Sequence, residues 1–179
     1  MNRREFLILT TGFAVTPGLA AKPLPAVTFT PDKRIGLDSH HWQVVDRALD
    51  HLFPSESDAP GARDVYATAW LHNALLMPDI DPDHREFMRN GALQLEETSL
   101  TLEKHSFIKL DAARREAVLR NLEQQPNGEA WLRETLRYIL EAMLSDPVYG
   151  GNPGAIGWKW LQHQPGFPRP PKNKRYFLL

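Results

Sequence analysis

The histidines and carboxylates near residue 40 are the side chains best placed to do chemistry. His40 and His41 are adjacent, with Asp38 before them and Asp46 after them, a combination that can bind a metal ion or transfer protons. Adjacent residues on a helix point about 100° apart, so the two imidazoles do not face one ion. The helical metal motif H-E-x-x-H is absent. We expect surface or hydrogen-bonded histidines here and at the five single positions: His51, His72, His84, His105 and His163.

Three aspartates at alternate positions, 79, 81 and 83, have the spacing that opens a calcium-binding loop. A complete loop needs glycine at its sixth position and glutamate at its twelfth, and this chain has His84 and Asn90 there. Proline directly after an aspartate is typical of a helix start, with Asp81 as the cap. The string therefore predicts the start of a helix and no calcium site.

Residues 150–157 contain four glycines and precede Lys159, which resembles a phosphate-binding loop. Such a loop leads from a strand into a helix, whereas this one follows a predicted helix and enters a proline-rich segment. No Gly-x-Ser-x-Gly elbow and no flavin, haem or nicotinamide motif is present. The sequence therefore predicts no catalytic residue, no metal site and no cofactor site in this chain.

Composition excludes several further classes. The chain has 179 residues, enough for one domain. Its 21 Lys and Arg balance 22 Asp and Glu, which argues against a protein that coats nucleic acid. The absence of cysteine excludes disulfides, thiolate zinc sites, iron–sulfur clusters and cysteine nucleophiles.

The N-terminus has the pattern of an export signal. Arg3 and Arg4 are followed by Phe6 and Leu7, then by a mild apolar run and small residues at 18–20. The string Arg-Arg-x-Phe-Leu resembles a twin-arginine signal, and a general secretory signal with a chance arginine pair is the alternative. We expect residues 1–20 to direct the chain to the periplasm.

Twin-arginine export carries folded proteins, usually because a cofactor was inserted in the cytoplasm. The chain therefore holds a cofactor or travels with a protein that holds one. No later segment is apolar over about 18 residues, so we expect a soluble mature protein that reaches a membrane only through a complex.

Apolar spacing predicts an all-α fold, a single bundle of about five helices. Residues 21–37 are expected to be a linker, 38–144 the bundle, and 145–179 an irregular Pro/Gly-rich arm with a basic and apolar tail. A short strand over 106–110 has too little support to claim. The expected helices are 39–53, 62–77, 82 to about 97, 112 to about 125 (capped by Asp111), and 128–144 (capped by Asn127).

The arm holds the strongest candidates for partner contact, because large aromatic side chains on irregular backbone are typical of interfaces. An alternative is that Tyr149 and Trp158 only pin the arm to the bundle. The apolar tail after a stiff, proline-rich spacer suggests docking into a neighbour. The candidates are Asp146, Pro147, Tyr149, Gly150, Gly151, Asn152, Gly157, Trp158, Trp160, Tyr176 and Phe177.

Several strings together resemble the gluconate 2-dehydrogenase small (gamma) subunit family. The resemblance runs from about Leu52 to Gly166, and its most specific part is Asp-Pro-Val-Tyr-Gly-Gly-Asn at 146–152. The link over 160–164 lacks the glycine that family members commonly have there. The strings are Leu52-Phe53-Pro54, Pro60-Gly61-Ala62, residues 145–152, Gly157-Trp158-Lys159 and Pro165-Gly166.

The resemblance implies a non-catalytic subunit. Family members accompany a large FAD-dependent dehydrogenase of the glucose–methanol–choline type that oxidises sugars or sugar acids, often with a cytochrome c subunit that carries haem. The small subunit's signal would export the folded, flavin-loaded pair. The alternative, from another class, is a free-standing periplasmic enzyme or sugar-binding module.

Overall fold

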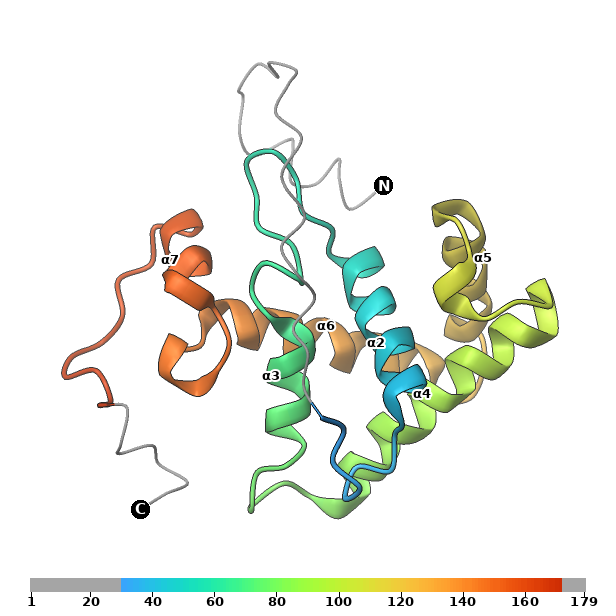
Figure 1. Ribbon diagram of the computed structural model, residues 1–179. Helices are drawn as coiled ribbons and strands as arrows, with labels where there is room; N and C mark the ends of the chain where they lie inside the picture. The colour runs from blue at the N-terminus through green and yellow to red at the C-terminus, as the bar shows by residue number, and fades with distance from the viewer. Residues whose placement is uncertain (1–29, 172–179) are drawn as a thin grey trace.

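Six α-helices and three short 3₁₀ helices, with no strand, make up residues 30–171, the part of the chain that the computed structural model describes (Figure 1). The expected all-α fold is confirmed. The predicted signal residues Arg3, Arg4, Phe6 and Leu7 and the tail residues Tyr176 and Phe177 lie outside this range. The helices are α2 (Ser39–Leu52), α3 (Ala67–Ala74), α4 (Pro82–Glu103), α5 (Ala112–Glu123), α6 (Gly128–Leu144) and α7 (Ile156–Trp160), with η1 (Phe107–Lys109), η2 (Pro147–Tyr149) and η3 (Pro153–Ala155).

Aspartate side chains start three of the long helices. Asp38, Asp81 and Asp111 each accept a hydrogen bond of 2.9 Å from a backbone N–H in the first turn, which satisfies a group that the helix itself leaves unpaired. Asn127 stands at the N-cap of α6 in the left-handed conformation, without a capping hydrogen bond from its side chain. The predicted starts of α2, α4, α5 and α6 are therefore confirmed.

Helix α3 is shorter than predicted. The expected range was 62–77, and the structure has eight helical residues from Ala67 to Ala74. Tyr66 adopts a positive φ of 57° at the N-cap, a conformation that no helix interior contains. Residues 62–66 therefore form turns and do not extend the helix that follows.

Helix α4 is longer than predicted and runs six residues past Glu97. Its inner face changes from apolar to polar there, because Glu96, Thr98 and Ser99 are all buried. The helix ends at Lys104, which has a φ of 58°. A period of apolar residues cannot reveal a buried face built from polar side chains.

The core lies where α2 contacts α3, α4, α5 and α6. In Figure 1, α6 passes behind α2 and α3, while α4 runs from the lower edge towards α5. The crossing of α4 and α6 depends on Gly91, because a Cβ there would overlap the ring of Trp131. The Trp131 indole N–H donates to the Met88 carbonyl at 3.0 Å, so the large ring is fully paired inside the core.

Both ends of the bundle differ from the sequence expectation. Ile35 and Leu37, at the end of the expected linker, are 2% and 5% exposed and belong to the core. The arm, expected to be irregular, contains η2, η3 and the five-residue helix α7. Within residues 30–171, no helix is long and apolar enough to cross a membrane.

Candidate partner-binding site

The histidines singled out by the sequence have local partners. His40 and His41 bind different carboxylates, Glu96 at 2.8 Å and Asp38 at 2.7 Å, as expected for adjacent residues on a helix. Within residues 30–171, no group of three or more His, Asp or Glu side chains is arranged to hold a metal ion. The remaining contacts are His51 to Glu116, His84 to the Tyr138 hydroxyl, His72 to Asn73, His105 to the Glu103 carbonyl, and His163 beside the Trp158 ring.

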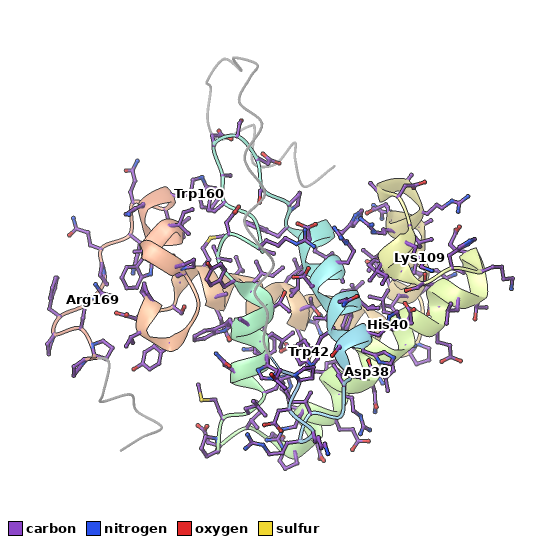
Figure 2. All side chains as sticks on the ribbon, viewed as in Figure 1. Asp38, His40, Trp42, Lys109, Trp160 and Arg169 are labelled. Carbon is purple, nitrogen blue, oxygen red and sulfur yellow. The ribbon has the colours of Figure 1, made fainter. Side chains whose placement is uncertain are left out.

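Glu96 is the most buried carboxylate among these pairs, with 6% of the residue exposed. Burial raises its pKa, but the nearby Ser106 hydroxyl and the hydrogen bonds with His40 and the Phe107 backbone N–H outweigh that effect and lower the pKa overall. The carboxylate ties α2 to the start of η1. Figure 2 shows His40 beside α4, at the N-terminal end of α2. We interpret this pair as part of the fold.

A shallow hollow of about 320 Å³ lies between α4 and the start of α6. Phe87 and Gly91 form its floor with an edge of Trp131, while Asp83 and Glu86 stand at its rim. The carboxylate of Glu86 binds Arg89 at 3.2 Å. The hollow does not bring a nucleophile and a base together.

Asn152 holds the start of the arm against the end of α6. It is fully buried. Its side-chain N–H donates to the Ser145 carbonyl at 3.0 Å, and its side-chain oxygen accepts from the Gly157 N–H at 2.7 Å. Its backbone N–H donates to the Val65 carbonyl at 3.0 Å. Through its side chain and its backbone, Asn152 therefore joins the end of α6, the turn before α3 and α7.

Two glycines allow this close packing. A Cβ on Gly151 would lie 2.9 Å from the Ala142 carbonyl oxygen, and one on Gly157 would overlap the Met143 carbonyl. Both positions are buried. Gly151, Asn152 and Gly157 therefore lie beneath the surface formed by the arm and the end of α6, and they determine its shape. The Asn152 side chain is buried and is not presented to a partner.

Trp158 and Arg169 fasten the rest of the arm. The Trp158 indole N–H donates to the Leu144 carbonyl at 2.8 Å, and the residue is 6% exposed. Arg169 makes two hydrogen bonds to the Asp146 carboxylate, at 2.8 and 3.0 Å, and its guanidinium lies 5.3 Å from the Trp158 ring centre. We call Asp146, Trp158 and Arg169 the clamp. The prediction that Trp158 pins the arm fits this geometry, and the role of Arg169 was not predicted.

The other predicted contact residues lie nearer the surface. Trp160 is 37% exposed, Gly150 is exposed, and Pro147 and Tyr149 are half-buried. Figure 2 places Trp160 on α7 and Arg169 on the segment beyond it, at the end of the molecule away from α5. Their contact with a partner stays a prediction.

Four exposed apolar side chains near this end were missed as contact candidates. Leu140 and Leu144 are 47% and 49% exposed on the last turns of α6, and Leu161 and Phe167 are 44% and 87% exposed in the arm. Leu140 and Leu144 follow the same spacing as the buried residues of α6. Spacing alone therefore does not distinguish them from core residues.

A model of the family described as gluconate 2-dehydrogenase subunit 3 matches residues 39–166. The chain belongs to this family. The match begins at α2 and includes the segment around Asn152 and α7, so it contains the whole region, from about Leu52 to Gly166, that resembles the family in sequence. Searches of curated proteins and of solved structures gave no match. The family description names a subunit of a multi-subunit dehydrogenase.

Proposed function

We propose that this chain is the non-catalytic small subunit of a periplasmic, flavin-dependent sugar or sugar-acid dehydrogenase. The observation that carries the proposal is the family match over residues 39–166, which covers all six α-helices of the described part of the chain, from α2 to α7. In this role the chain stabilises the catalytic flavoprotein and supplies the signal for its export.

The arrangement of the ionisable residues supports a non-catalytic role. The His–carboxylate pairs His40–Glu96 and His51–Glu116 each link two elements of the bundle, and neither belongs to a larger cluster among residues 30–171. General acid–base catalysis needs such a pair beside a cavity that admits a substrate. The hollow at Asp83 and Glu86 contains neither pair.

The partners and cofactors follow from the family. The principal partner is a large FAD-dependent dehydrogenase of the glucose–methanol–choline type, and a cytochrome c subunit with haem completes the complex in some family members. This chain itself binds no cofactor in the proposal. Twin-arginine export suits such a pair, because the flavin is inserted before the protein crosses the membrane.

Replacing the arginine pair tests the export role. In the variant Arg3→Lys with Arg4→Lys, dehydrogenase activity should remain in the cytoplasm, since the twin-arginine route needs the pair. A matched control, Lys22→Arg, changes a cation outside the signal and should leave export unchanged. Unchanged periplasmic activity in the double variant would rule out the escort role.

A further inference from the structure

One histidine lies inside the protein. His72, in the last turn of α3, is 7% exposed, whereas the six other histidines of the chain are half-buried or exposed. The imidazole packs edge-on against Trp42 of α2, with the two ring centres 5.2 Å apart, and Trp42 is itself buried. Figure 2 shows Trp42 near the start of α2, beside α3. A group that can gain a charge is therefore part of the contact between two helices.

The segment over residues 30–37 packs against the same core. Ile35 and Leu37 are buried and belong to one apolar cluster with Trp42. The segment turns through a hydrogen bond of 3.1 Å from the Ile35 N–H to the Asp32 carbonyl. In Figure 1 it is the blue stretch that leads into α2. It contains no helix, so burial of two side chains and one turn hold it in place.

Two charged groups of this segment act on His72. The Asp32 carboxylate favours the protonated imidazole, and the Arg34 guanidinium opposes it. These two groups pair with each other at 2.8 Å, so their effects on a charge at His72 counteract one another. Burial is the largest influence, and it lowers the pKa of His72 because a buried cation loses its hydration.

Charged side chains that hydrogen-bond to α3 or to its C-cap from other elements do not offset this effect, because each is bound to another group. They are Asp46 of α2, which binds Thr68 and Arg63, Arg85 of α4, which binds the Leu75 carbonyl, and Glu141 of α6, which binds Trp70 and Arg137. The end of α3 would favour a cation, but Arg85 already occupies that place. A proton on His72 therefore puts a poorly compensated charge into the interface.

We propose that His72 is a pH-sensitive latch on residues 30–37: the neutral imidazole lets this segment pack against α2 and α3, and protonation releases the segment. The released stretch is the one that leads from the predicted export signal at residues 1–20 into the bundle. It opens before the helices do because it has the fewest buried side chains and hydrogen bonds to lose. This inference does not depend on the proposed function.

Linkage gives the direction and the size of the response. In the released state His72 is exposed to water and has the ordinary histidine pKa of about 6.5, whereas in the packed state its pKa is lower. The packed state therefore has its full advantage above about pH 6.5 and loses it as the pH falls below that value. Between pH 7.5 and pH 5.5 the equilibrium constant for release should rise severalfold, and by at most about tenfold.

Hydrogen exchange of the full chain, purified from its native cells, measures the release at these two pH values after correction for the intrinsic effect of pH on exchange. The reporter is the backbone amide of Ile35, and amides of α6 serve as the internal control. Exchange at Ile35 should become severalfold faster at pH 5.5, while α6 keeps its protection. An equal loss of protection in α6 would mean that acid unfolds the whole bundle, and it would overturn the latch.

Two variants separate His72 from the other titrating groups. His72→Gln keeps a polar side chain that does not titrate, and its corrected exchange at Ile35 should change by less than about twofold between the two pH values. The matched control, His51→Gln, removes the half-buried histidine that binds Glu116 at 3.0 Å and should respond to pH as the wild type does. A pH response that survives in His72→Gln would overturn the proposal.

An NMR titration of the His72 imidazole in the full wild-type chain tests the same point without any substitution. The proposal requires a pKa below the ordinary value of about 6.5. A pKa at or above that value would overturn it, because protonation would then stabilise the packed state or leave it unchanged.

Discussion

Replacing Asn152 with alanine removes a side chain that joins the end of α6 to α7 and keeps the backbone N–H that bonds to the turn before α3. In the native chain its amide donates to the Ser145 carbonyl at 3.0 Å and accepts from the Gly157 N–H at 2.7 Å, with no exposure to solvent. Alanine leaves the partly buried Ser145 carbonyl and the buried Gly157 N–H without those partners. It also has to adopt the left-handed conformation, since φ at this position is 50°.

The expected loss is a large share of the stability of a domain. A buried backbone group left without its partner costs about 1–3 kcal/mol, and two groups lose their partners. The left-handed conformation costs alanine about 1–2 kcal/mol, whereas asparagine tolerates it. Asn152→Ala should therefore lower the free energy of unfolding by about 3–8 kcal/mol, against about 5–15 kcal/mol for a typical domain.

Urea unfolding of the isolated chain, followed by far-ultraviolet circular dichroism, measures this loss. The matched control is Asn152→Gly, which removes the same hydrogen bonds but adopts a positive φ without strain. The glycine variant should be more stable than the alanine variant by about 1 kcal/mol. A loss of less than about 1 kcal/mol in Asn152→Ala would refute the assignment of Asn152 as the structural link between these elements.

Three further predictions concern packing and charge. Gly91→Ala should destabilise the chain by about 1–3 kcal/mol, because the added methyl overlaps the Trp131 ring, and a thermal melt checks it. Trp158→Ala should cost about 3–5 kcal/mol in urea unfolding through loss of a buried ring; a change near zero would mean that the ring does not anchor the arm. The hydrogen bonds from Arg169 hold the pKa of Asp146 below its usual range. The stability that Asp146 contributes is therefore present above about pH 4 and is lost as the pH falls through the lowered pKa. Asp146→Asn should be less stable than the wild type at pH 7, and the difference in the free energy of unfolding should shrink as the pH falls below about 4; a difference that does not shrink would contradict this account.

The sequence predicted the long helices where local chemistry marks their starts. Asp38, Asp81 and Asp111 cap α2, α4 and α5. The errors arose where tertiary structure overrides a local pattern. Tyr66 takes a positive φ that no local sequence pattern predicts. Glu96 is buried with two hydrogen-bond partners outside α4: His40, which is distant in sequence, and Phe107, which follows the helix.

The arm was harder to predict because its structure depends on single long-range hydrogen bonds. Helix α7 is too short to show a period, and its position is fixed by Asn152, Trp158 and Arg169. The sequence identified the first two of these as unusual and assigned them to partner contact or to shaping the contact surface. The structure buries both of them, and of the predicted contact residues that it describes, Gly150 and Trp160 are exposed.

The most direct test of the proposed subunit role is to purify this chain gently from its native cells and record the visible spectrum and the subunits that accompany it. A C-terminal tag and, in parallel, a tag inserted in the exposed loop over 55–58 guard against a tag that blocks the arm over residues 145–179. The proposal predicts a flavin absorbance band and a large co-purifying chain with both tags. A colourless, monomeric product from both tagged forms would contradict it.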